Sequence, residues 1–297
     1  MDIRPSPFAG RWYEGDADLL AQAVDAYVDA PQVEPPAGEV LALIAPHAGH
    51  VYSGPVAGYA FRTVRGRQFD TVVVLSPSHF HADGPLITSA HAAYATPLGK
   101  VAVDQAGLAA VRADLQQQFQ VPGGMILPGI RRDQEHAIEI ELPFLQRVLS
   151  GAFQLIPIMV RDQSQRMVQG LALALARVLR AAGRRALIVG SSDLSHYYSA
   201  VEAKALDAHM LRQIEAFDPE GVLRAEDEGR GFACGRGPIA AALWAARDLG
   251  ANQARVLRHA TSGDVTGDRA EVVGYGAAVV WREQRLAAET DSAADSI

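Results

Sequence analysis

Two histidines and the only cysteine of this 297-residue chain stand in turns that could bring them to one metal ion. His47 follows the β-forming run at residues 40–44, and His79 follows a second such run at residues 71–75. Cys234 lies in a glycine-rich segment. Two imidazoles and a thiolate can hold a transition metal and leave positions open for a substrate, water or O2. The pattern therefore predicts a mononuclear site with His47, His79 and Cys234 as ligands.

Both histidines also have a simpler interpretation. His47 is flanked by proline, alanine and glycine, and an imidazole in such a turn can do no more than bond a neighbouring loop. His79 is followed two residues later by His81, which would face the same side if the segment were extended. We favour His79 as the ligand and expect His81 to line the pocket or to face solvent.

Cys234 could likewise be an inert buried thiol. The helix expected from Pro238 begins shortly after it, and Arg236 is close in sequence. A helix N-terminus and a guanidinium would both lower the pKa of the thiol and favour the thiolate. As a catalytic nucleophile Cys234 would need a histidine base, and His196 could serve.

His196 and Asp193 follow another buried run at residues 185–190. A histidine near a carboxylate is the arrangement of a general acid/base whose tautomer its partner fixes. A serine or Asp193 could equally cap the helix expected from about Tyr198. A hydrolase nucleophile is disfavoured, because the run Gly-Ser-Ser-Asp-Leu lacks the G-x-S-x-G elbow. We predict that His196 moves protons with Asp193 beside it.

A further histidine, His136, opens a predicted helix. Glu135 precedes it, and Glu139 lies three residues on, on the same helical face. Acidic residues in a first turn interact favourably with the helix dipole, so we expect Glu139 and Glu141 to be capping residues. A neutral imidazole gains little from a helix start, which leaves His136 as a candidate pocket residue.

The elements that must position these residues alternate along the chain. Such alternation predicts one α/β domain with a mostly parallel or mixed sheet covered by helices, at residues 1–283, and a flexible tail at 284–297. In such folds ligands bind beyond the carboxyl ends of the strands. The expected strands are 40–45, 71–75, 153–160, 185–190, 254–259 and 272–281. The expected helices are 55–64, 108–118, 139–149, 164–181, 203–216 and 238–249.

Composition narrows the class of protein. The net charge is −7 and the lysines and arginines are scattered, which disfavours nucleic-acid binding. The charged first twenty residues do not resemble a signal peptide, and no apolar run approaches the length of a membrane span. A single cysteine cannot form an internal disulfide. We expect a cytoplasmic protein that contacts neither nucleic acid nor a membrane.

Six short motifs together resemble the Memo family, also called protein B of the AmmeMemoRadiSam system. They occur in the order of that family from near residue 5 to near residue 281. The motifs are residues 10–13, 45–49, 77–79, 135–139, 191–196 and 234–239.

The resemblance implies a fold like that of the class III extradiol, non-haem iron dioxygenases. Those enzymes hold Fe(II) with two histidines and a glutamate, and a further histidine acts as acid/base. In Memo proteins the matching pocket has two histidines and a cysteine, here His47, His79 and Cys234. His196 matches the acid/base histidine, and His136 matches a second pocket histidine. The thiolate in place of a carboxylate is softer and shifts preference toward copper, zinc or a differently tuned iron.

Three functions follow from these expectations. The first is a redox or oxygen-handling enzyme with Fe(II), or alternatively copper or zinc, in which His196 moves protons while His136 and Asp193 orient an unknown small substrate. The second is a non-catalytic metal carrier or peptide-binding protein that uses the same cleft. The third is zinc-dependent hydrolysis. The resemblance also implies partnership in a pathway with a radical SAM enzyme and with protein A of the same system.

Overall fold

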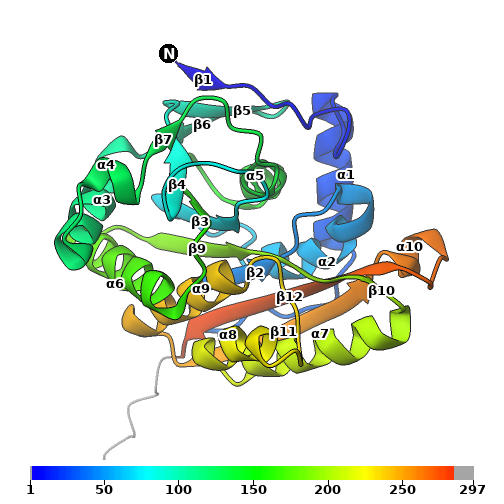
Figure 1. The fold of residues 1–297 in the computed structure, drawn as a ribbon. Helices are drawn as coiled ribbons and strands as arrows, with labels where there is room; N and C mark the ends of the chain where they lie inside the picture. Colours follow the sequence, from blue (N-terminus) through cyan, green and yellow to red (C-terminus); the bar gives the residue numbers. More distant parts are fainter. Residues whose placement is uncertain (1, 284–297) are drawn as a thin grey trace, which may run out of the picture.

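The computed structural model describes residues 2–283, which form an α/β fold around a twelve-stranded mixed sheet (Figure 1). The main path through the sheet runs β1-β5-β6-β8-β3-β9-β2-β12-β10, with β11 paired to β12 and β4 to β8. The strands are β1 Ile3–Arg4, β2 Glu39–Ala45, β3 Thr71–Pro77, β4 Leu86–Ser89, β5 Ala93–Thr96, β6 Gly99–Val103, β7 Gly129–Ile130, β8 Gln154–Val160, β9 Ala186–Ser191, β10 Asp193–Tyr198, β11 Gln253–Thr261 and β12 Val272–Arg282.

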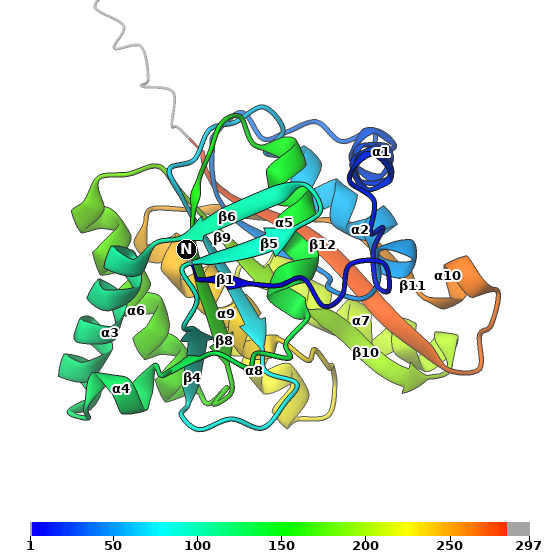
Figure 2. The same cartoon turned by 90° about the horizontal axis from the view of Figure 1, so that it is seen from above.

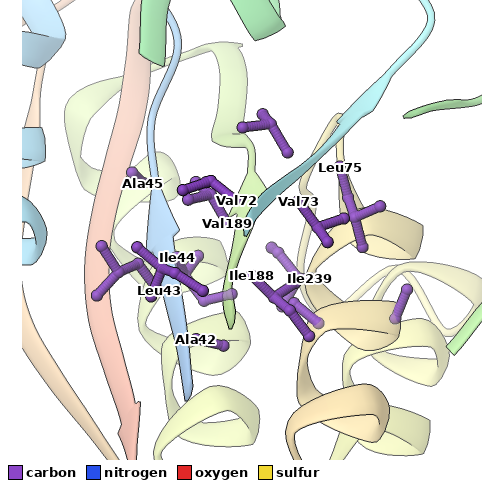
Figure 3. Close-up of a cluster of buried hydrophobic side chains, with 14 of the residues drawn as sticks. Ala42, Leu43, Ile44, Ala45, Val72, Val73, Leu75, Ile188, Val189 and Ile239 are labelled. Carbon is purple, nitrogen blue, oxygen red and sulfur yellow. The ribbon is translucent and has the colours of Figure 1, made fainter. Parts of the chain in front are cut away.

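The centre of the sheet is parallel. β2 and β3 both pair with β9, and Ala45 lies opposite Ser191 while Leu75 lies opposite Gly190. These strands are continuous apolar runs because helices cover both of their faces. Figure 3 shows the resulting core, in which side chains of β2, β3 and β9 pack together with Ile239 of the covering helix.

Helices lie on both sides of this sheet (Figures 1 and 2). α2 and α5 pack on one side with α1 outside them, and α9 packs on the other side with α6 against it. Two shorter helices and α7 complete the cover around β10–β12. The helices are α1 Ala17–Asp29, α2 His50–Arg62, α3 Gln105–Phe119, α4 Gly123–Ile126, α5 Ala137–Val148, α6 Gln165–Ala182, α7 Ala200–Glu215, α8 Pro219–Asp227, α9 Arg236–Asp248 and α10 Gly263–Thr266.

The predicted α/β class with a mixed sheet is confirmed, and each predicted strand and helix overlaps an observed one. Most of the predicted helices begin a few residues earlier than predicted, and the largest difference is at α2, which starts at His50 and accommodates Pro55 in its second turn. The helix expected from about Tyr198 is α7, which begins at Ala200. The segment before it, Asp193–Tyr198, was not predicted to be a strand, but it forms β10, which pairs with β12.

Two expectations concern the chain as a whole. Within residues 2–283, none of the helices combines the length and apolar character that crossing a membrane requires. The tail predicted to be flexible, residues 284–297, lies outside the described residues.

Candidate metal centre

The loops after three neighbouring strands meet at one edge of the sheet. His47 follows β2, His79 follows β3, and Asp193 follows β9. The backbone N–H of Ser192 donates to the carbonyl of Ala45 at 2.9 Å, which ties two of these loops together. Because β2, β9 and β3 are parallel, their carboxyl ends lie side by side, as the sequence predicted.

Three histidines from these loops and from the start of α5 form a compact cluster. The ring centroids of His47 and His79 are 5.3 Å apart, and those of His47 and His136 are 5.4 Å apart. His79 and His136 stack at 4.7 Å. Each ring offers one nitrogen such that all three nitrogens lie within 4.8 Å of one another. The cluster could therefore hold a metal ion.

The Nδ1 atoms of two rings in the cluster are hydrogen-bonded to an oxygen. His47 Nδ1 lies 2.8 Å from Ser191 Oγ, and His79 Nδ1 lies 2.9 Å from Glu135 Oε1. His136 Nδ1 lies 3.2 Å from the same Glu135 oxygen, as a charge contact. In His47 and His79, a proton on Nδ1 leaves the lone pair on Nε2, which is the tautomer that metal-binding histidines use when a second group orients them.

His50 provides a contrast on the neighbouring helix. Its Nε2 lies 3.0 Å from the carbonyl of Ile140, and its Nδ1 is buried without a partner in the described part of the chain. Burial lowers the pKa of His50 to about 4, so the ring is neutral. His50 packs against Tyr13 and Phe144 and belongs to the core.

Cys234 is not one of the three residues of this cluster, but it contacts His47. Its Sγ lies 3.3 Å from His47 Nε2, within hydrogen-bonding distance. Two ligands of one tetrahedral ion, with metal–nitrogen and metal–sulfur bonds of ordinary length, lie about 3.5 Å apart. The spacing of these two atoms fits shared coordination, and the nitrogen and sulfur donors suit zinc, copper or iron.

The loop that carries Cys234 is held by its backbone. Cys234 N donates to the carbonyl of Asp193 at 3.2 Å, and Gly235 N donates to Ser192 Oγ at 2.9 Å. A Cβ on Gly235 would lie 2.5 Å from the carbonyl oxygen of Ser191. Only glycine therefore allows this loop to approach the end of β9 so closely.

The expectation that Arg236 and a helix N-terminus lower the pKa of the thiol is wrong for the metal-free chain. Burial, followed by the negative charge of Asp193, raises the pKa of Cys234 well above its usual range. Arg236 is paired with Asp227 and Glu226. Cys234 is therefore a neutral thiol at pH 7 in this state, and a bound cation would be needed to stabilise its thiolate.

Asp193 holds the loop that carries His47 through two hydrogen bonds to its backbone. Its Oδ1 accepts from the backbone N–H of His47 at 2.8 Å and from that of Ala48 at 3.3 Å. Burial raises the pKa of Asp193 to about 7, although these two hydrogen bonds act in the opposite direction. Asp193 does not cap a helix: Ser199 caps α7, with a capping box to Glu202.

The predicted pairing of Asp193 with His196 is also not found. His196 Nδ1 lies 2.7 Å from the carbonyl of Leu194, two residues away in strand β10. The ring packs against Phe232 at 5.5 Å and lies close enough to His47 and His79 for their charges to interact. Burial lowers the pKa of His196, so its Nε2 carries a free lone pair at neutral pH.

Glu139 and Glu141 were expected to be capping residues, and this is wrong for both. Glu139 is fully buried and bonds Arg4 and Tyr13. Glu141 is fully buried beside Ser191, and its Oε2 has no partner among the described residues. Burial raises the pKa of Glu141 to about 8.

The sequence did not reveal the residues that orient the histidines. Glu135 accepts from the backbone N–H of both His79 and His136 in addition to the ring of His79. Burial alone would raise the pKa of Glu135, but the hydrogen bonds from His79 and the charges of His79 and His136 together lower it. Burial alone would lower the pKa of His79, but Glu135 and the charge of Asp193 raise it. In the sequence, the only indication of this role was that Glu135 directly precedes His136.

The cluster is closed on one side and open on the other. The side chain of His47 is fully buried, that of His136 is 15% exposed, and that of His79 is 36% exposed. His81 is exposed, as one of the two alternatives for it predicted. A ligand could therefore approach the free nitrogens from the side of His79.

The fold and the cluster define an α/β protein with a histidine site at the carboxyl ends of parallel strands. A family profile described as Memo-like protein matches residues 4–279. A MEMO1 family protein of Aeropyrum pernix is 36% identical over 286 residues, covering 93% of this chain and 98% of the relative. A MEMO1 family protein of Nitrosopumilus maritimus is 32% identical over 280 residues, with coverage of 93% and 98%. The chain belongs to the Memo family, as its motifs indicated.

Proposed function

We propose that this protein is a metal-dependent enzyme of redox or oxygenase-like type in which His47, His79 and Cys234 hold one iron or copper ion. The observation that carries the proposal is the arrangement of the three rings, whose nitrogens lie within 4.8 Å of one another, with Nδ1 of His47 and Nδ1 of His79 each hydrogen-bonded to an oxygen. A histidine that only filled the core would have no need of this arrangement. Fe(II) is the proposed metal, with copper or zinc as alternatives.

The chain's own residues divide the remaining tasks. Asp193 fixes the His47 loop, and Glu135 fixes the rings of His79 and His136. His196 has a free Nε2 near the cluster and would accept or donate a proton during turnover. A bound iron or copper would supply the electron transfer that these side chains cannot. His136 and Asp193 would orient the substrate.

A second candidate is a non-catalytic metal carrier. The specific observation in its favour is Cys234, whose soft sulfur would retain copper or zinc well. A metal carrier, however, does not need an acid/base group such as His196 Nε2 beside the metal. The catalytic proposal uses both features and is the one we adopt.

The pathway and partners belong to the same proposal. We infer a step shared with a radical SAM enzyme and with protein A of the AmmeMemoRadiSam system, acting on a small molecule or peptide. Family membership supports this inference.

The test is anaerobic metal analysis of tag-free protein, with iron, copper and zinc titrated separately. Wild-type protein is expected to bind about one equivalent of iron or copper, and both Cys234→Ser and His79→Ala should lose it. His81→Ala is a matched control, because His81 is exposed and outside the cluster. Absence of binding, or equal binding by the Cys234 and His79 variants, would overturn the ligand assignment.

A further inference from the structure

A cavity of about 500 Å³ adjoins the histidine cluster without including any of its rings. Three of its lining residues are immediate neighbours of the site. Ala48 follows His47, Tyr197 follows His196, and Trp12 contacts the ring of His136 with centroids 4.3 Å apart. A molecule in this cavity would therefore lie next to the proposed reaction centre.

Aromatic rings line the cavity to an unusual degree. Trp12, Tyr52, Tyr197 and Tyr275 all contribute to its wall. Tyr52 is 40% exposed and Tyr197 is 73% exposed, so neither ring is explained by packing of the core. Solvent-exposed rings gathered around one cavity indicate a surface that a ligand covers.

Tyr197 is also held in a backbone conformation that aromatic residues rarely adopt. Its φ is 61°, in the left-handed region, which costs free energy for a residue other than glycine. The strain places an exposed ring at the cavity directly after the acid/base candidate His196. The residue lies where the register of β10 against β12 shifts between His196 and Tyr198.

Charged groups on the cavity wall are unpaired within the described residues. Asp268 and Glu271 both line the cavity. Asp268 accepts from the backbone N–H of Ala270, and neither carboxylate forms an ion pair within residues 2–283. Arg11 is the only cationic residue of the lining and is likewise not in an ion pair among residues 2–283. Two carboxylates against one guanidinium leave a net negative charge beside the aromatic rings.

We propose that this cavity binds an alkylammonium group of an organic ligand next to the histidine cluster. Aromatic rings attract organic cations through their negative faces, and the two carboxylates add a charge of the matching sign. The group could be carried by a small amine or by a side chain of a peptide, since both present the same chemistry. If the protein is the enzyme proposed above, this ligand is its substrate. Only that identification as the substrate rests on the proposed function.

The test compares a cation with its uncharged isostere in metal-free, full-length protein. Choline and 3,3-dimethylbutan-1-ol have nearly the same shape, and their binding is measured by ligand-observed NMR. Choline is expected to bind, and the alcohol should bind at least about fivefold more weakly. Equal binding of the two, or no binding of choline, would overturn the proposal.

Variants assign that binding to the cavity. Tyr52→Ala and Glu271→Gln should each weaken choline binding severalfold, whereas Glu34→Gln, an exposed carboxylate elsewhere, should not. Unchanged affinity in both cavity variants would contradict the assignment even if choline bound. Circular dichroism spectra check that each variant is folded.

Two peptides distinguish the sources of the cation. One carries a single lysine among glycine and serine residues, and the other carries norleucine in its place. Tighter binding of the lysine peptide than of choline supports a peptidyl ligand, and binding of choline alone supports a small amine. All of these binding experiments use metal-free protein, so they are independent of the metal titration. If the metal titration fails, the cavity can still bind a cation, but that binding has no role in catalysis. If choline binding fails, the proposed metal site is unaffected.

Discussion

Glu139 and Glu141 lie two residues apart in α5, and both are fully buried, yet their surroundings differ. Glu139 is paired with the buried Arg4 and accepts from the Tyr13 hydroxyl at 2.7 Å. Among the described residues, Glu141 has no cation beside it, and its side chain bonds only the Ser191 hydroxyl. Arg4 compensates the negative charge of Glu139, whereas no cation compensates a charge on Glu141 within the described residues.

This difference indicates that Glu139 has a structural role, whereas Glu141 belongs to the candidate metal centre. The Glu139 ion pair joins the N-terminal strand β1 to α5. Glu141 instead forms the end of a buried chain of hydrogen bonds that passes through Ser191 to His47 Nδ1. An uncompensated buried carboxyl is costly, and such groups concentrate at functional sites.

The largest effect is expected from breaking the structural pair. Arg4→Met would leave Glu139 and Asp133 buried without their cation, and unfolding free energy should fall by about 3–5 kcal/mol. Chemical denaturation measures this directly. Arg131→Met, which removes an exposed ion pair to Asp2, should lower the unfolding free energy far less. Equal losses in the two variants would contradict the assigned roles.

A smaller effect is expected from Glu141, and it depends on pH. The folded carboxyl keeps its proton up to a pKa of about 8, whereas the unfolded one ionises near 4.5, so folding takes up a proton between these values. Stability of metal-free wild type, relative to Glu141→Gln, should therefore fall by a few kcal/mol as pH rises from 4.5 to 8. Denaturation of both proteins across this range tests it. A constant difference would show that the carboxyl ionises normally.

The next effect concerns metal affinity rather than folding. Ser191→Ala removes the oxygen that holds the proton on His47 Nδ1, and zinc affinity should fall by about 10–100-fold. Competition with a chromophoric chelator measures the affinity. Ser199→Ala, which removes a helix cap away from the cluster, is the control and should leave affinity unchanged. Loss in both variants would point to general destabilisation.

The smallest effect is expected at the open side of the cluster. Glu135 raises the pKa of His79 against the opposing effect of burial. Glu135→Gln should lower the pKa of His79, and NMR titration of the imidazole in metal-free protein follows it. An unchanged or higher pKa would mean that Glu135 does not set the charge of this ring.

The sequence predicted the sheet and the residues at its edge, because buried parallel strands are continuous apolar runs and their ends are marked by turns. It did not predict that Glu139 and Glu141 are buried, since a first-turn carboxylate looks the same whether it caps a helix or enters a core. Arg4 and Ser191, the partners that distinguish them, lie more than a hundred and about fifty residues away, respectively. Strand β10 was missed because its pairing partner β12 is also distant in sequence, with Asp193 opposite Tyr275.

The central claim is that Cys234 shares a metal with His47 and His79. X-ray absorption of anaerobic protein loaded with one equivalent of zinc tests it most directly, with Cys234→Ser and His136→Ala measured beside wild type. We expect one sulfur scatterer at about 2.3 Å and nitrogen scatterers at about 2.0–2.1 Å in wild type. The sulfur should vanish in Cys234→Ser and persist in His136→Ala. A wild-type spectrum with nitrogen and oxygen alone would contradict the claim and leave the three histidines as the ligands.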